Sequence, residues 1–195
     1  PTHEAGFVAE TGEREYRLDE AGDEVVVPFV WQGPDGVTIR RTITVRRGAY
    51  AIDVRDTVIN AGNAPWQGHI YRQLSRVPPN ISRGMTNPES FSFNGATWYS
   101  DEEGYTRRPF AKFLNDGAIN LQATESWTAI LQHHFFTAWI PQPEDRTVIS
   151  VHEDGPRHLV RQLGPGLSVA AGQEASVDAR LWVGPKLVEQ IKAQG

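Results

Sequence analysis

Histidine is the side chain best suited to metal binding and to acid–base chemistry near neutral pH, and the chain contains six. His133 and His134 are adjacent in a stretch that alternates like a β-strand, so their side chains would point to opposite faces. They could not chelate one ion together, and no ligand spacing supports a metal site, so we expect no metal and no cofactor. His69, His152 and His158 are isolated in sequence, and any of them could act as an acid or base if the fold supplied a partner.

Other candidate chemistry is weaker. The acidic run at residues 101–103 (Asp-Glu-Glu) could hold a cation, but the glycine after it favours a solvated turn. Residues 164–166 (Gly-Pro-Gly) lack the Lys and Ser/Thr of a phosphate-binding loop, and no serine has a nucleophile-elbow context. Trp127 and Trp139 could stack on a sugar or a peptide, although their apolar neighbours favour core packing. We therefore expect no catalytic residue.

The charge balance limits the partners. The 195 residues carry 19 Lys and Arg against 24 Asp and Glu, for a formal net charge of −5. No basic cluster is longer than a pair, so we expect no nucleic-acid binding. The absence of cysteine excludes disulfides and thiolate chemistry. No apolar run approaches the roughly 20 residues that span a bilayer, and no signal peptide is visible, so we expect a piece excised from a longer protein.

Alternating apolar and polar residues predict the secondary structure. Strands are expected at residues 25–31, 37–45, 50–58, 69–74, 127–131, 135–140, 147–151, 157–163 and 174–183. In the last strand, the residues expected on one face are Ala175, Val177, Ala179, Leu181 and Val183. Residues 78–113 are punctuated by Pro and Gly, which predicts a long loop region with short strands. About ten closely spaced strands predict an all-β sandwich of antiparallel sheets.

This pattern divides the chain into three segments. Residues 1–24 are polar and irregular, residues 25–184 form the sandwich, and residues 185–195 form a C-terminal α-helix. Pro185 suits the first helical position, where its missing N–H costs nothing. Leu187 and Ile191 lie on one apolar stripe of this helix, which is too short to be stable alone. We expect it to dock on the sandwich through that stripe.

Four segments resemble a known family. Residues 127–141 (WTAILQHHFFTAWIP) resemble a strand pair ending in Phe-(Ala/Thr)-Ala-Trp-Ile-Pro, and residues 181–186 (LWVGPK) resemble the junction between the last strand and the next helix. Residues 47–62 resemble an Arg-Gly-x-Tyr strand followed by an Asn-x-Gly turn, and residues 94–100 are similar to a Gly-Ala-x-Tyr segment. Their order and spacing resemble the large periplasmic domain of the YidC-type membrane protein insertases (YidC/Oxa/Alb family).

The resemblance implies a fold and a role. It implies a β-supersandwich similar to galactose mutarotase, on the periplasmic side of the bacterial inner membrane. The parent protein would insert and fold inner-membrane proteins through membrane helices to which this domain is attached. The implied partners are SecD–SecF, other Sec translocon components and nascent membrane proteins. The functionally sensitive junction to the membrane part would comprise Trp182, Gly184, Pro185, Leu187 and Ile191.

Three hypotheses of function remain open. The first is a non-catalytic scaffold and interaction domain. The second is a carbohydrate-binding protein or an aldose-epimerase-like enzyme on the same sandwich, which fold alone cannot separate from the first. A His and a carboxylate converging within hydrogen-bond reach would favour that enzyme. The third is a cleft that holds extended peptides by edge-strand addition, which requires an open sheet edge or an apolar groove.

Overall fold

The structure is a computed structural model that describes residues 4–78, 92–113, 117, 119–132 and 134–185. The chain divides into two compact units. The first unit comprises Pro1–Ile70 and Pro165–Leu181, and the second comprises Tyr71–Gly164 and Trp182–Gly195. Three strands, β5 (Trp66–Arg76), β12 (Arg157–Val169) and β13 (Glu174–Pro185), run from one unit into the other. The described chain is nearly all antiparallel β-sheet, so the predicted fold class is confirmed.

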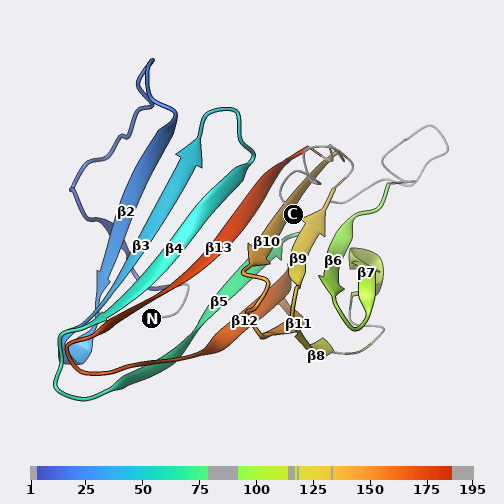
Figure 1. Cartoon of the computed structure of the whole chain (residues 1–195). Coiled ribbons are helices and arrows are strands. Elements are labelled where there is room, and N and C mark those ends of the chain that lie inside the picture. The colour runs from blue at the N-terminus through green and yellow to red at the C-terminus, as the bar shows by residue number, and fades with distance from the viewer. Residues whose placement is uncertain (1–3, 79–91, 114–116, 118, 133, 186–195) are drawn as a thin grey trace. The chain divides into compact units, whose positions relative to one another are not determined.

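The first unit is built on a sheet in the order β1-β2-β3-β4-β13 (Figure 1). Its strands are β1 (Val8–Ala9), β2 (Glu24–Gln32), β3 (Val37–Arg46), β4 (Ala51–Asn60) and the first part of β13. Ile39 stands opposite both Trp31 and Val58, so alternate residues of three strands share one inner face. Ile39 and Val58 pack there with Val37 and Val169 to form the core of this unit.

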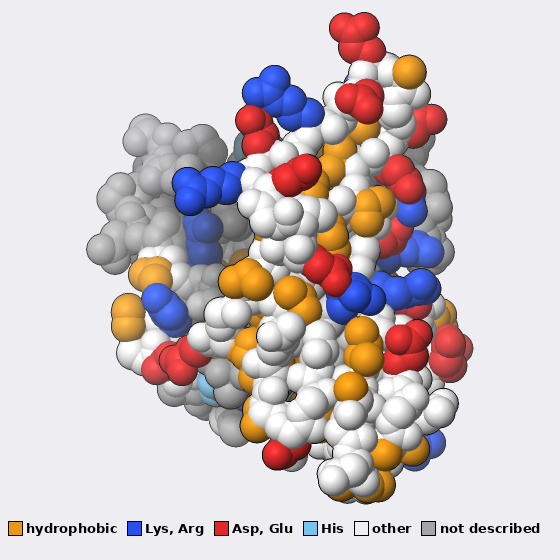
Figure 2. Space-filling view, turned by 90° about the vertical axis from the view of Figure 1, so that its left-hand side faces the viewer, with side chains coloured by type: hydrophobic (Ala, Val, Ile, Leu, Met, Phe, Trp, Pro, Cys, Tyr) orange, Lys and Arg blue, Asp and Glu red, His pale blue; other side chains and the backbone are white. Residues whose placement is uncertain are grey.

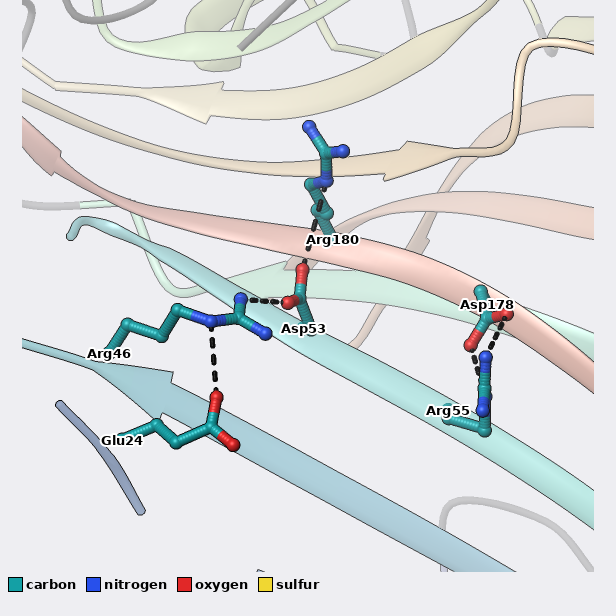
Figure 3. A network of polar contacts seen from close by, with 6 residues as sticks. All are labelled: Glu24, Arg46, Asp53, Arg55, Asp178 and Arg180. Atoms are coloured by element: carbon teal, nitrogen blue, oxygen red, sulfur yellow. Dashed lines mark hydrogen bonds and ion pairs between the residues drawn. The ribbon is translucent and has the colours of Figure 1, made fainter. Parts of the chain in front are cut away.

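The other face of this sheet carries charge pairs. Arg46 bonds Asp53 and lies 3.3 Å from Glu24, and Arg55 donates to both carboxylate oxygens of Asp178 at 2.7 and 3.0 Å (Figure 3). Arg180 extends the network to Asp53, so the pairs cross β2, β3, β4 and β13. On the face drawn in Figure 2, acidic and basic side chains are interspersed with hydrophobic ones. Each exposed ion pair of this kind contributes little to stability. Together, the charged side chains keep this face of the sheet hydrophilic.

The second unit is a sandwich of two sheets. One has the order β13-β10-β9-β6-β7, with β6 (Gly95–Ser100), β7 (Gly104–Pro109), β9 (Trp127–Leu131) and β10 (Phe135–Pro141). The other has the order β5-β12-β11-β8, with β8 (Ile119–Ala123) and β11 (Thr147–Asp154). Trp98 and Ile130 from the first sheet meet Ile149 and Val160 from the second in one buried cluster. Two short 3₁₀ turns, η1 (Pro34–Gly36) and η3 (Phe110–Lys112), complete the described elements.

The middle of the chain contains short strands, as predicted. The expected loop region contains the paired strands β6 and β7, and Trp98 in β6 is almost completely buried. Residues 79–91 of that region lie outside the described residues. β8 was not predicted. His134 lies in a bend between β9 and β10, closed by a 2.9 Å bond from Gln132 N to Phe135 O, and not on a strand; His133 lies outside the described residues.

The last strand also differs from expectation. Ala175, Val177 and Ala179 lie on the inner side as predicted, but the phase of burial shifts by one residue between Leu181 and Trp182. Val183 is therefore exposed, whereas Trp182 is buried. Pro185 is the last residue of β13 and not the first residue of a helix. Within the described residues, no helix is long and apolar enough to cross a membrane.

At the N-terminus, residues 4–23 are irregular except for β1, whose two residues pair with Phe29 and Val30 of β2. The predicted helical residues Leu187 and Ile191 lie outside the described residues.

Candidate functional site

The Arg-Gly motif at the turn between β3 and β4 fastens the N-terminal segment. Arg47 Nη2 donates to the carbonyl oxygens of Asp19 and Gly22 at 2.8 and 3.1 Å, and its backbone N–H donates to Asp23 O at 2.8 Å. Gly48 has φ 72°, a conformation that favours glycine. The motif thus joins an otherwise irregular stretch of chain to the sheet.

The Asn-x-Gly motif ties together several turns of the first unit. Asn60 is 1% exposed, and its amide Nδ2 donates to the carbonyl oxygens of Ala64 at 2.8 Å and Val169 at 2.9 Å. Its Oδ1 accepts from Gly62 N at 3.0 Å, so both ends of the amide are used. A β-carbon on Gly62 would lie 2.3 Å from the carbonyl oxygen of Asp35, so only glycine fits. Asn60 is therefore a structural residue that joins the turn after β4 to the end of β12.

The Trp-Ile-Pro motif plays the same part in the second unit. Trp139 Nε1 donates to Gln73 O at 3.4 Å, which joins β10 to β5. The guanidinium of Arg72 lies over the Trp139 ring at 5.2 Å. Arg161 donates to Gln73 Oε1 at 2.7 and 3.0 Å and lies 4.9 Å from the ring centre of Tyr71. Trp139 thus packs inside the unit, as its apolar neighbours suggested.

The junction motif is also built into the fold. Trp182 is 2% exposed and stacks on Phe136, with ring centroids 5.7 Å apart and planes inclined by 16°. Gly184 is buried and Pro185 is half-buried. Phe136 and Ala138 alternate with Trp139, so they lie on the face of β10 opposite to β5. The end of β13 is therefore held by side-chain packing on that face.

His158 provides the test of the enzyme hypothesis. Its Nε2 lies 3.2 Å from Glu153 Oε1, which meets the distance condition for a converging His and carboxylate. The two residues are direct cross-strand partners at the end of the β11–β12 hairpin, so their contact is set by register. The imidazole packs edge-on against Phe110 and Phe113, with centroids 5.2 and 4.7 Å away. Strand register alone would produce this contact, so the pair does not by itself identify an active site.

Asp56 is a buried carboxylate that takes part in an ion pair. Asp56, 1% exposed, accepts a 2.7 Å bond from Arg41 Nε, and Arg41 lies 5.2 Å from the ring centre of Phe7. Burial, and then the charge of Arg161, lower the pKa of His152. In the parts of the chain that the structure describes, no three His, Asp or Glu residues are arranged to hold a metal ion.

The family model of the YidC periplasmic domain matches residues 1–195. The chain belongs to this family. A relative from Xanthomonas euvesicatoria, named membrane protein insertase YidC, is 56% identical over 186 residues, which cover 95% of this chain and 32% of the relative. The chain therefore spans about a third of the length of its curated YidC relatives.

The solved structures similar to this YidC domain confirm its fold. An α-galactosidase from Lactobacillus brevis has a TM-score of 0.62 at 10% identity, covering 92% of this chain and 26% of that one. A galactose mutarotase-like protein from Clostridium acetobutylicum has a TM-score of 0.55 at 8% identity, covering 91% and 66%. At such identities the likeness concerns the galactose-mutarotase-like sandwich alone.

The structure brings together only some of the residues that the sequence singled out. Trp182 and Gly184 are buried in one strand end, whereas His134, His152 and His158 lie in a bend or on paired strands without forming one site. Sequence reasoning missed Arg47 and Asn60 as individual residues, although both stand in motifs that carried the family resemblance. A lone Asn in a turn gives no signal that it bonds residues far along the chain.

Proposed function

We propose that this chain is the non-catalytic periplasmic domain of a membrane protein insertase, and that it assists insertion by holding and orienting the chain that leaves β13. The observation that supports this proposal is the stacked pair of Trp182 and Phe136 beside buried Gly184. A strand end fixed by a buried indole leaves the domain in a defined direction. A loose tail would transmit no orientation to a membrane part.

The motif residues support a structural role. Arg47, Asn60 and Trp139 each bond backbone carbonyl groups and thereby join segments of their own unit. Side chains used in this way have little capacity left to bind and turn over a substrate. A domain whose family motifs maintain its shape is suited to presenting surfaces.

Family membership supports the remaining parts of the proposal. The domain would stand on the periplasmic side of the bacterial inner membrane, joined to the membrane helices of the full-length protein. It would serve as a scaffold for Sec accessory proteins, with SecD–SecF, the Sec translocon and nascent membrane proteins as partners. The helix expected after Pro185 would dock through Leu187 and Ile191 and continue the direction set by Trp182.

The test separates direction from stability. Two glycines inserted directly after Pro185 remove no buried side chain but uncouple the domain from the membrane part of the full-length protein. We expect the full-length insertase with this insertion to insert a reporter membrane protein more slowly, while the isolated domain keeps its melting temperature. The matched control is the same insertion after Gly155, which lies in the exposed turn between β11 and β12. Equal insertion rates for both variants would refute the proposal.

The contact between His158 and Glu153 favours a second candidate, a sugar epimerase. It predicts that the isolated chain accelerates the mutarotation of galactose in a polarimeter and that His158→Gln abolishes the acceleration. We expect the wild-type chain to show the rate of buffer alone. A rate enhancement lost in the variant would replace our proposal with this one.

A further inference from the structure

Three aromatic side chains form a row on one face of β7, β6 and β9 in the second unit, at the strand ends that lie beyond buried Thr97 and Ala129. Tyr99 stands opposite Tyr105 on one side and Trp127 on the other. The ring of Trp127 lies 6.3 Å from that of Tyr99 and 5.9 Å from that of Tyr105. Tyr105 is 54% exposed and Tyr99 36%, so the row presents aromatic surface to solvent. Trp127 is half-buried, and none of the three belongs to a described hydrophobic core cluster.

Three connected turns border this row at one end of the strands. Asp101, after β6, accepts a 2.6 Å bond from Thr124 Oγ1 and a 3.3 Å bond from Thr124 N, after β8. Glu125 N in turn donates to Pro143 O at 3.1 Å, after β10. Together, residues 101–103, 124–126 and 142–146 contain many more acidic than basic side chains. The acidic ones are Asp101, Glu102, Glu103, Glu125, Glu144 and Asp145, and the basic one is Arg146.

Within the acidic rim, hydrogen bonds favour the charged form of Asp101. The hydroxyl of Thr124 lowers the pKa of Asp101, and backbone N–H groups lower it further. The rim is spread over separate turns, and the described residues hold no metal-binding group of His, Asp and Glu. Such a rim produces a negative potential over the neighbouring rings and attracts a partner whose positive charge is also spread.

We propose that the row of Tyr99, Trp127 and Tyr105, with its acidic rim, is a docking surface for an extended, Arg- or Lys-rich segment of another polypeptide. Guanidinium and ammonium groups bind over aromatic faces, and nearby carboxylates strengthen and steer that contact. Exposed Tyr and Trp are also the residues that most often dominate protein interfaces. A neutral glycan could stack on the rings but would gain little from the rim, so charge complementarity favours the basic segment. The proposed function makes no use of these residues.

The test uses the 195-residue chain and a ten-residue peptide of alternating Arg and Ser. Calorimetric titration at low salt should show binding that weakens steeply as salt rises. Tyr105→Ser removes an exposed ring and should weaken binding roughly three- to fivefold, the usual strength of an exposed cation–π contact. Glu102→Gln with Glu103→Gln should weaken binding and also reduce its salt dependence. The control is Glu13→Gln with Glu15→Gln, two exposed carboxylates of the first unit, which should leave the affinity unchanged.

Two results would overturn the inference. The first is equal binding of a peptide with Gln in place of each Arg, or a peptide affinity that Tyr105→Ser leaves unchanged. The second is salt-independent binding of chitotetraose, a neutral oligosaccharide, in preference to the Arg-Ser peptide, which would assign the row to glycans. Thermal unfolding of each variant shows that a lost affinity reflects the surface and not the fold. Neither result bears on the insertion rates that test the proposed function, so the two proposals fail separately.

Discussion

Trp182 in β13 and Phe136 in β10 stack with their ring centroids 5.7 Å apart. The indole is almost fully buried, and replacing it with Ala leaves a cavity as well as losing the stack. We expect Trp182→Ala to lower the free energy of unfolding by about 3–5 kcal/mol, as measured by urea denaturation. Trp182→Phe keeps an aromatic ring and should recover part of that loss. A wild-type denaturation midpoint for the Ala variant would show that the stack does not hold the strand end.

Asn60→Ala should destabilise the first unit. The change leaves the carbonyl oxygens of Ala64 and Val169 without the amide that bonds them. Val169 is buried, and a buried group left without its partner costs about 1–3 kcal/mol, so the loss should exceed that of an ordinary surface change. Asn63→Ala, at an exposed position of the same turn, is the control and should cost less than about 0.5 kcal/mol. If both variants lost the same free energy of unfolding, the hydrogen bonds of Asn60 would not stabilise the unit.

Stability should fall as pH drops through the range of histidine titration. Burial and Arg161 lower the pKa of His152, so the unfolded chain binds a proton at this site more readily than the folded chain. The resulting loss begins as pH falls below the unfolded pKa of about 6.5 and is complete below the folded pKa. The melting temperature of His152→Gln should drop less between pH 7.5 and 5.5 than that of wild type. His134→Gln is the control, and the same drop in all three proteins would contradict this account.

Leu187→Asp with Ile191→Asp tests the expected docking of the helix. Burying a Leu or Ile side chain stabilises a fold by about 1.5–3 kcal/mol, so the double change should lower the melting temperature and impair insertion by the full-length protein. Val183→Asp is the control because Val183 is exposed in β13. If the double variant melts and inserts like wild type, the segment is a passive linker.

The fold class could be predicted from the sequence because the alternation of apolar and polar residues indicates which face of each strand is buried. The predicted residues of β2 and β3 fall within the observed strands, and those of β4 do so except for Tyr50, which precedes the strand. The prediction failed where both faces of a strand are buried or the phase changes. In β6 nearly every residue is buried, so Trp98 stands in no alternating pattern. In β13 the phase shift before Trp182 reversed the expected burial of Val183.

Less of the candidate site could be predicted. The bonds of Asn60 to Val169 and of Arg47 to Asp19 join residues far apart in sequence, and no local pattern reports such pairings. The aromatic row was equally hidden, because Tyr99, Tyr105 and Trp127 meet only through the register of three strands. The acidic run at residues 101–103 was visible, but its link to Thr124 was not.

We propose that this domain serves insertion by its shape and not by catalysis. The most direct measurement is the rate at which the full-length insertase inserts a reporter membrane protein when it carries Glu153→Gln with His158→Gln, beside the variant with two glycines after Pro185. We expect the wild-type rate for the first variant, because Glu153 and His158 are cross-strand partners in a hairpin, and a reduced rate for the second. A reduced rate for the pair variant, with its domain still folded, and a wild-type rate for the glycine variant would contradict the account.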